Sequence, residues 1–443
     1  MNIQLSEHFT YRKLLRFTLP SIVMMVFSSI YGVVDGVFVS NYVGAEAFAA
    51  VNLIMPFLMI LGAVGFMLGT GGSALVSFTL GAGDTRRANE IFSLLIYVLI
   101  AVGAVFTLGG IAVMEPMARF LGADEQMLPI CVSYGRIVLA ALIPFMLQNT
   151  FQSFLITAER PHFGLYITIA AGVSNMVLDA LFIAVFRWGV AGAALATGIS
   201  QFIGGIIPLV YFIFPNKSKL RLCPAKFDSG VLLKASTNGA SEFMTNISMS
   251  IVNMLYNWQL MRLMGAAGVA VYGVIMYVNF IFVAIFLGYS IGSAPIVGYH
   301  YGAQNSKELQ SLLRKSLCLT AIMSLVLTAA ALLLARPLSL IFTSYDPVLL
   351  ETTVHAFSVY ALSFLLVGFN IFASSFFTAL NDGAISALIS FARTLVFQIA
   401  AVLLLPLFLS VDGVWGAVIA AEALALVLSA ACLMGKRKKY GYL

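Results

Sequence analysis

The sequence predicts an all-α polytopic membrane protein with twelve transmembrane helices in two pseudo-symmetric six-helix bundles. Three observations support this fold class. Of 443 residues, 61% are hydrophobic and only 9% are charged, apolar runs long enough to cross a bilayer follow one another along the chain, and short motifs return in order in the second half. Soluble domains carry roughly a quarter charged residues, so the composition excludes a sizeable water-soluble catalytic domain.

The first six spans are read from apolar runs separated by short polar breaks, because a span needs roughly 20 apolar residues. They are 17–43, 51–80, 91–118, 132–157, 163–186 and 190–214. Basic residues before Phe17 resemble the start of a signal peptide. However, the first run is much longer than the roughly 7–15 residue core of a cleaved signal, so we expect a retained span.

The second half repeats this organisation after a basic segment that contains Pro215 and Pro224. Its spans are 235–262, 268–298, 313–335, 354–378, 384–409 and 413–434. We therefore expect an N-terminal bundle at 1–214, a linker at 215–234 and a C-terminal bundle at 235–443.

An internal repeat supports the division into halves. The matching segments are 72–74 with 292–294, 81–84 with 302–305, 149–158 with 370–379, and 189–193 with 413–417. Each match is short, but their order and nearly constant offset favour a duplication. Six spans separate the copies, so both halves enter the membrane from the same side, as in a parallel repeat about an axis along the membrane normal.

The distribution of basic residues predicts the orientation. With the N-terminus inside, 18 of the 24 Lys and Arg residues fall in cytoplasmic segments and four fall outside. Such a bias sets orientation in multi-pass proteins. We expect a multi-pass protein of the cell membrane, inner or plasma, with both termini and the linker in the cytoplasm.

Several functions are excluded or disfavoured by missing motifs. There is no phosphate-binding P-loop, so ATP is not a direct energy source, and no nucleophile elbow or metalloprotease motif suggests an enzyme. The four Cys and four His residues are too dispersed for a readable metal site or disulfide framework. The basic residues lie in short connectors, which argues against a nucleic-acid partner.

The chemistry of the first half centres on two acidic residues at one depth. Asp35 and Asp179 lie eight and seven residues before the outer ends of their spans, which places both roughly 11–12 Å below the outer boundary. Asn175 shares a helical face with Asp179, and Thr197 enters from the next span. Intramembrane acids are usually functional, and oxygen ligands of this kind suit H⁺ or Na⁺. The alternative is a purely structural role, in which the two acids hydrogen-bond neighbouring helices.

These residues belong to motifs that resemble the multidrug and toxic compound extrusion (MATE) family, and the resemblance covers essentially all twelve spans. The motifs are Leu19-Pro20-Ser21 with Asp35, Gly81-Ala82-Gly83-Asp84, Asn175 through Asp179, and Gly189 through Thr197. The resemblance implies cation or proton coupling at Asp35, Asn175, Asp179 and Thr197. It also implies a polar position at Asn149 and a bending point at Pro20.

The second half does not duplicate the acid pair. At an offset of 224 residues, Asp179 maps to Leu403 and Thr197 to Ala421. Glu422 and Asn253 lie at a depth similar to that of Asp35, whereas Glu242 and Arg393 lie nearer the inner side. We expect Glu242 and Arg393 to form a buried ion pair; the alternative is an acid that binds substrate or gates a cavity.

Together these observations predict a secondary antiporter that exports amphipathic, cationic, drug-like molecules in exchange for H⁺ or Na⁺. It is expected to work as a monomer in the lipid bilayer, without a cofactor, and not as an enzyme. One alternative is a lipid-linked oligosaccharide flippase of the related fold, for which a cavity rich in Arg and Lys would be needed. The other is a non-transporting membrane scaffold or receptor.

Overall fold

The computed structural model describes residues 3–343 and 346–442, and helices dominate both halves of the chain. The helices of the first half are α1 (Tyr11–Phe38), α2 (Ala45–Gly81), α3 (Thr85–Phe120), α4 (Met127–Ala140), α5 (Leu142–Thr157), α6 (Pro161–Asp179) and α7 (Gly189–Ile213). Those of the second half are α8 (Ser229–Asn238), α9 (Ala240–Met264), α10 (Ala266–Gly302), α11 (Ser306–Thr343), α12 (Pro347–Ala361), α13 (Phe364–Ala379), α14 (Gly383–Phe391), α15 (Gln398–Leu404) and α16 (Pro406–Tyr440).

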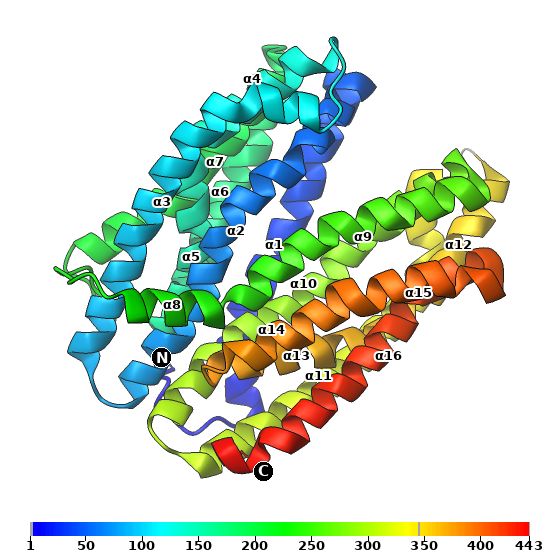
Figure 1. Ribbon diagram of the computed structural model, residues 1–443. Coiled ribbons are helices and arrows are strands. Elements are labelled where there is room, and N and C mark those ends of the chain that lie inside the picture. Colours follow the sequence, from blue (N-terminus) through cyan, green and yellow to red (C-terminus); the bar gives the residue numbers. More distant parts are fainter. Residues whose placement is uncertain (1–2, 344–345, 443) are drawn as a thin grey trace.

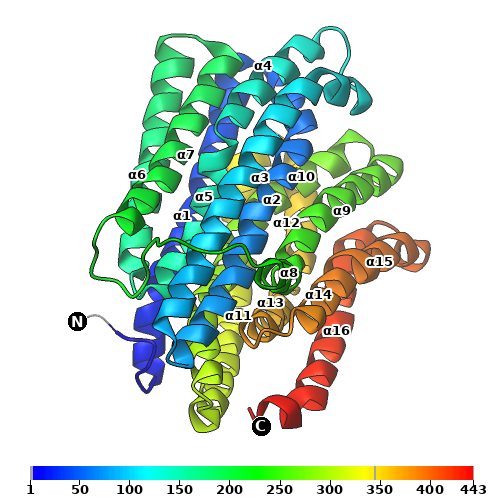
Figure 2. The same ribbon diagram turned by 60° about the vertical axis from the view of Figure 1, so that its left-hand side comes forward.

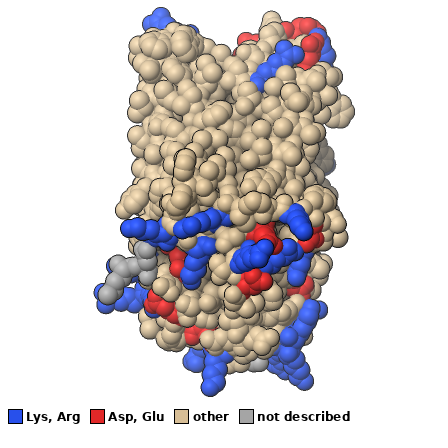
Figure 3. All heavy atoms as spheres, turned by 90° about the vertical axis from the view of Figure 1, so that its left-hand side faces the viewer, with Lys and Arg blue, Asp and Glu red and all other residues tan. Residues whose placement is uncertain are grey.

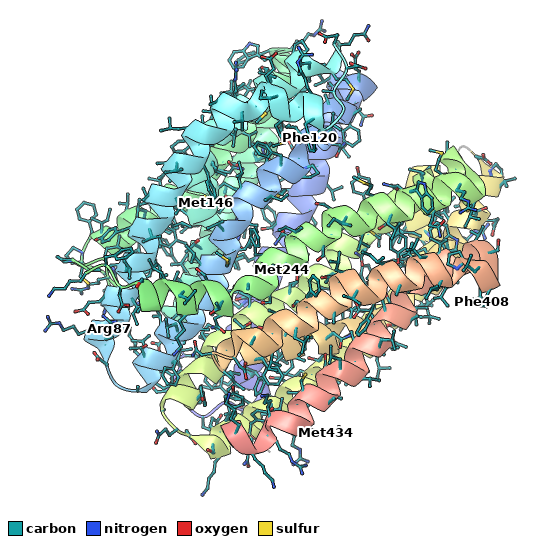
Figure 4. The ribbon with its side chains drawn as sticks, viewed as in Figure 1. Arg87, Phe120, Met146, Met244, Phe408 and Met434 are labelled. Carbon is teal, nitrogen blue, oxygen red and sulfur yellow. The ribbon has the colours of Figure 1, made fainter. Side chains whose placement is uncertain are left out.

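The two halves form two lobes that diverge like the arms of a V (Figure 1). Helices α1 and α2 of the first lobe pack against α10 of the second, and α2 also packs against α8 and α9. Both chain ends lie towards the end of the molecule at which the lobes converge, in both ribbon views (Figures 1 and 2). We call this the closed end. Phe120 and Phe408 lie at the opposite ends of the two lobes, which we call the open end (Figure 4).

Twelve crossings account for the helices. Within the described residues, nine helices are long and apolar enough to span a membrane, and two bent pairs, α4 with α5 and α12 with α13, bring the number to eleven. The twelfth is α9, whose polar residues, including Glu242 and Asn253, lower its hydropathy. The predicted all-α, twelve-helix, two-bundle fold is therefore confirmed.

Several predicted spans are interrupted. The span predicted at 132–157 bends by 55° between α4 and α5. Pro144 explains this bend, because its ring lacks an N–H and clashes with the carbonyl four residues earlier, at Ala140. The span predicted at 235–262 breaks at Gly239. The segment Pro406–Tyr440 consists of two helices separated by a kink at Ser410, where φ is 51°, so the last span starts after Ser410, close to the predicted residue 413.

The lobes meet through reciprocal glycine contacts that follow the repeat. Gly81 on α2 lies so close to the backbone of Tyr299 on α10 that a Cβ there would overlap the carbonyl oxygen. Its repeat partner, Gly302 on α10, lies in the same way against the carbonyl of Phe78 on α2. The glycines thus let the two helix backbones approach to a distance that no other residue permits.

The segment before α1 also joins the lobes at the closed end. Leu5 and Phe9 are fully buried. The backbone N–H of Leu5 donates to Glu159 of the first lobe at 2.8 Å, and that of Phe9 donates to Glu308 of the second at 2.9 Å. This N-terminal strap is a packed part of the structure.

Charged residues are distributed in bands along the molecule. In Figure 3, a broad tan band separates a few charged residues at the open end from many Lys and Arg residues towards the closed end. A band of this kind fits a hydrocarbon core, because charged side chains are costly inside it.

The connector between the lobes is held by an ion pair. Asp228 is the N-cap of α8, and its carboxylate accepts hydrogen bonds from the N–H groups of Gly230 and Val231. The same carboxylate accepts a hydrogen bond from Arg87 Nη2 at 2.6 Å. The expected linker 215–234 therefore includes the first turns of α8 as well as an extended stretch.

This ion pair makes a pH-dependent contribution to stability. Arg87 and the N–H groups of the α8 N-terminus lower the pKa of Asp228. Since its folded pKa lies below the unfolded one, the contribution is present at neutral pH and is lost as pH falls through the folded pKa. Asp228→Asn keeps an N-cap but removes the charge. We expect its melting temperature to lie slightly below wild type at pH 7, and the difference to vanish as pH falls below about 4. Thermal melts across that range measure this, and a constant difference would contradict it.

Candidate functional site

The first lobe places two carboxylates at the contact between α1 and α6. Asp179 is the last residue of α6, and Asn175 lies one turn before it; their exposed fractions are 0% and 1%. Asp35 comes from α1, which packs along α6. Gly172 lets the helices approach closely, because a Cβ there would overlap the ring of Phe27.

The oxygens of this cluster lack hydrogen-bond donors. Among the described residues, Asp35 Oδ1, Asn175 Oδ1 and both carboxylate oxygens of Asp179 are buried without a hydrogen-bond partner. The two carboxyl groups are close enough to interact with each other. A buried acceptor without a donor is costly, so the cluster suits a proton or a small hard cation that would satisfy these oxygens.

Thr197 lines a different feature from the three residues of this cluster. It lines a small cavity of about 40 Å³ together with Tyr134 and Gln201. Tyr134 is buried near enough to Asp35 and Asp179 to feel both charges. The structure therefore brings Asp35, Asn175 and Asp179 together, and it places Thr197 on the wall of a small cavity that Tyr134 also lines.

Short π-helical turns accompany the charged residues of both lobes. In the described part of the chain there are three: Val39–Val43 soon after Asp35, Ala180–Val185 directly after Asp179, and Ala392–Phe397 around Arg393. Such turns are frequent at functional sites, because they interrupt the regular hydrogen-bond ladder and redirect side chains.

Two residues implied by the family resemblance lie apart from the cavities. Asn149 is buried on α5, its backbone carbonyl faces Gly69 of α2, and it lines neither cavity described here. Pro20 lies inside α1, which runs through it as one helix. Bending at Pro20 stays a prediction.

The second lobe contains a larger cavity of about 350 Å³. Met25 and Ser29 of α1 complete its wall on the first-lobe side. The other lining residues used below are Glu242, Met249, Asn253, Tyr256, Tyr272, Met276, Tyr360, Arg393, Gln398 and Glu422. Its volume lies within the range of small-molecule sites, roughly 300–1,000 Å³.

The prediction of an ion pair between Glu242 and Arg393 is wrong. Arg393 Nε instead contacts both carboxylate oxygens of Glu422, at 2.8 and 2.9 Å. Asn370 Nδ2 donates to the same carboxylate at 2.7 Å. The turn that carries Arg393 packs against both α9, which carries Glu242, and α16, which carries Glu422, and the guanidinium is directed at the carboxylate on α16. Glu242 forms no ion pair within the described residues.

Tyrosines form one wall of this cavity. The rings of Tyr256 and Tyr272 stack with centroids 4.9 Å apart and planes 5° from parallel. The hydroxyl of Tyr272 donates to Asn253 at 2.7 Å, and that of Tyr256 donates to Gln398 at 3.0 Å. Asn253 therefore contributes to this cavity by holding a tyrosine in place.

The sequence analysis did not predict a role for two residues at these sites. Asn370, which binds Glu422, stands at the repeat position of Asn149, and this equivalence was a usable signal. Tyr134 carried no such signal, because it is one of 17 tyrosines in a largely apolar chain.

Metal ligands do not gather in the described part of the chain. No group of three or more His, Cys, Asp or Glu residues there has an arrangement that suits a metal ion. A Na⁺ ion at the first-lobe cluster would need amide, hydroxyl or backbone oxygens in addition to Asp35 and Asp179.

Twelve crossings in two repeated lobes, with buried carboxylates in one lobe and an open cavity in the other, define a polytopic membrane transporter. The chain belongs to the MatE family, the MATE transporters. The family model matches it twice, at residues 20–181 and 243–404. The two matches begin 223 residues apart (243 − 20), which agrees with the internal repeat.

Similar proteins cover nearly the whole chain. The multidrug export protein MepA of Staphylococcus aureus (strain MRSA252) is 22% identical over 417 residues, covering 94% of this chain and 92% of that protein. MepA of Staphylococcus haemolyticus (strain JCSC1435) is 22% identical over 422 residues, covering 95% and 93%.

Solved structures share the fold. A MATE protein in complex with MaL6 superposes with a TM-score of 0.92 at 21% identity, covering 98% of each chain. The outward-facing conformation of a multidrug resistance MATE family transporter gives 0.91 at 22% identity, again covering 98% of each chain. A transporter from Pyrococcus furiosus, described as having a binding pocket of reverse polarity that suggests a different function, gives 0.90 at 22% identity, covering 98% and 97%.

Proposed function

We propose that this chain is a secondary active antiporter that exports amphipathic, cationic small molecules in exchange for H⁺ or Na⁺. Family membership and the similarity to the MepA export proteins support export of drug-like molecules. The V-shaped arrangement, with its lobes apart at the open end, supports release on that side.

One observation carries the coupling part of this proposal. Asp35 Oδ1, Asn175 Oδ1 and both carboxylate oxygens of Asp179 are buried without hydrogen-bond donors among the described residues, where α1 and α6 pack together. A protein that only needed rigid packing would place apolar side chains there, because unsatisfied acceptors destabilise the fold. Uptake of H⁺ or Na⁺ satisfies them, and its release leaves them unsatisfied again.

Exchange follows if the cation and the substrate favour different arrangements of the lobes. The two sites are then linked by a coupling free energy, although they lie in different lobes. The driving force is adequate, since one charge crossing 100 mV supplies about 2.3 kcal/mol.

The flippase alternative finds little support in the cavity. A lipid-linked oligosaccharide carries phosphates, which Arg and Lys would bind. Arg393 is the one basic residue that lines the larger cavity within the described residues, and Glu422 neutralises it. The scaffold or receptor alternative leaves the unpaired carboxylates without a role.

Efflux from proteoliposomes tests the proposal. The purified protein is reconstituted, loaded with a fluorescent cationic dye, and given a pH gradient or a Na⁺ gradient in separate runs. We expect one gradient to drive efflux above that of protein-free liposomes. No response to either gradient would refute antiport.

We further propose that residues 1–214 and 235–443 act as the two moving units. The linker 215–234 and both chain termini then lie in the cytoplasm. In a cysteine-free background, Lys226→Cys should resist a membrane-impermeant maleimide added outside intact cells and react after permeabilisation. A cysteine at exposed Phe120, at the open end, is the matched control and should react from outside. The reverse pattern would invert the topology.

We also expect the second lobe to recognise substrate. Glu242→Gln and Glu422→Gln each remove a charge from the larger cavity but leave the first-lobe cluster intact. The ranking of substrates should therefore change, by about tenfold between cations of different shape, while the dependence on the driving gradient stays. Dose–response efflux assays with several cations measure both properties. Equal loss of ion dependence in both variants would instead indicate coupling spread over both lobes.

A further inference from the structure

The N-terminal strap, residues 3–10, precedes α1 and contacts both lobes at the closed end. Its described residues include a turn but no helix. On the first-lobe side, the N–H of Leu5 donates to Oε1 of Glu159, in the turn between α5 and α6. The side chain of Glu159 is 11% exposed, and it also accepts a hydrogen bond from Lys219 of the linker at 2.7 Å.

The second lobe holds the strap through more polar contacts. Glu308, at the start of α11, accepts the N–H of Phe9 on Oε1 at 2.9 Å, and its Oε2 lies 2.6 Å from the ring of His8. Lys315, further along α11, donates to the carbonyl oxygen of Phe9. Among the described residues, the strap therefore has three polar contacts with α11 and one, through Leu5, with the first lobe.

Apolar contacts close the boundary between the lobes beneath the strap. Leu5 and Phe9 are fully buried, and they belong to one core cluster with Ile156 of the first lobe and with Ile296 and Leu309 of the second. This burial favours the closed arrangement, because separation of the lobes would return apolar surface to water.

The strap also covers a histidine that lacks a good partner. His300, near the end of α10, is 2% exposed, and the ring of Phe9 packs edge-on against it with centroids 6.5 Å apart. Neither ring nitrogen has a hydrogen bond of good geometry within the described residues, although the backbone of Leu5 lies next to the ring. An unsatisfied buried imidazole is costly, and water would satisfy it once the Leu5 end of the strap lifted. The closed contact is therefore poised to open.

We propose that the N-terminal strap is a latch for the closed end. Its Phe9 end stays on α11 of the second lobe, and its Leu5 end releases Glu159 of the first lobe when the lobes separate there. The latch rests on the proposed function, because alternating access requires the closed end to open.

Cysteine accessibility in the detergent-solubilised protein, without any gradient, tests the latch. Ser77 of α2 is fully buried between the lobes, where a Cβ on Gly298 of α10 would lie 3.1 Å from its side chain. With the latch intact, Ser77→Cys in an otherwise cysteine-free protein should react slowly with a maleimide. Adding Glu159→Ala should raise the rate about tenfold, because a hydrogen bond to a charged acceptor is lost only from the closed state. An unchanged rate would overturn the latch.

Lys219→Gln is the control for the linker. It removes the other partner of Glu159 but leaves the hydrogen bond from Leu5 in place. The labelling rate of Ser77→Cys should therefore stay at the value for the intact latch. If Lys219→Gln accelerates labelling as much as Glu159→Ala does, the linker holds the closed end and the latch is refuted.

A second variant keeps the test decisive if Glu159→Ala unfolds the protein. Unfolding is detected with a protein whose single cysteine is Cys131, which is fully buried inside the first lobe and should stay unreactive. If Cys131 reacts, Leu5→Ala replaces Glu159→Ala, and Leu19→Ala, the same change at an exposed position of α1, is its matched control. Faster labelling of Ser77→Cys with Leu5→Ala than with Leu19→Ala supports the latch, and equal rates would overturn it.

The outcome is separable from that of the export proposal. If the strap variants open the closed end but neither gradient drives efflux, antiport fails and the latch stands. If a gradient drives efflux but the strap variants leave labelling of Ser77→Cys unchanged, the latch alone fails.

Discussion

Asp179→Asn and, separately, Asp35→Asn are expected to abolish gradient-driven efflux of every substrate. The amide keeps the size of the side chain but cannot take up a proton. It also removes a negative charge from a cluster in which four buried oxygens have no donor among the described residues. We expect the rate to fall by at least about tenfold, which is roughly 1.4 kcal/mol of the barrier. Dye efflux from proteoliposomes under the active gradient measures this loss.

Asp412→Asn is the matched control for these substitutions. Asp412 lies on α16 and pairs with His355, and both side chains are more than half exposed. Its loss should leave efflux at the wild-type rate. If an Asp35 or Asp179 variant behaves like this control, with an unchanged dependence on the gradient, the carboxylate concerned has only a structural role.

Gly302→Ala and Gly81→Ala are expected to destabilise the closed end. Either Cβ would overlap a backbone carbonyl oxygen on the facing helix, and a backbone cannot move aside as a flexible side chain can. Overpacking of this kind typically costs about 1–3 kcal/mol, so the melting temperature in detergent should fall by several degrees.

Gly273→Ala tests the same change on the same helix at an open position. A Cβ at Gly273 would have no atom within 4 Å. Alanine is the better helix former, so this variant should be neutral or slightly more stable, by up to about 1 kcal/mol. If Gly302→Ala has the same melting temperature as this control, the backbones at the closed end are not in the contact described.

The fold could be predicted because membrane spans are set by composition. Apolar runs of sufficient length leave little choice but helices in a bilayer, where every backbone group must be satisfied internally. Even α9 was found, although its polar residues bring it below the hydropathy of the other spans. What hydropathy could not show was the bend before Pro144 or the break at Gly239. These depend on a local clash and on a neighbouring helix.

The first-lobe cluster was accessible from sequence for a similar reason. Depth in a helix follows from counting residues, so Asp35 and Asp179 could be placed at one level before their contact was known. The partner of Arg393 could not be chosen in this way. Glu242 and Glu422 both lie in spans of the same lobe. Which of them pairs with Arg393 depends on how the helices are rotated about their axes, and this rotation cannot be read from a single sequence.

The glycine contacts between α2 and α10 give the molecule a mechanical property. Because α2 has 37 residues, it is roughly 55 Å long. Gly81 sits at its closed end, so a tilt of one lobe about that point acts as a lever. A rotation of about 10° would carry the far end of the helix by roughly 10 Å, while atoms next to the glycines move by less than about 1 Å. The distance between the lobes at the open end can therefore change with very little rearrangement of the atoms around Gly81 and Gly302.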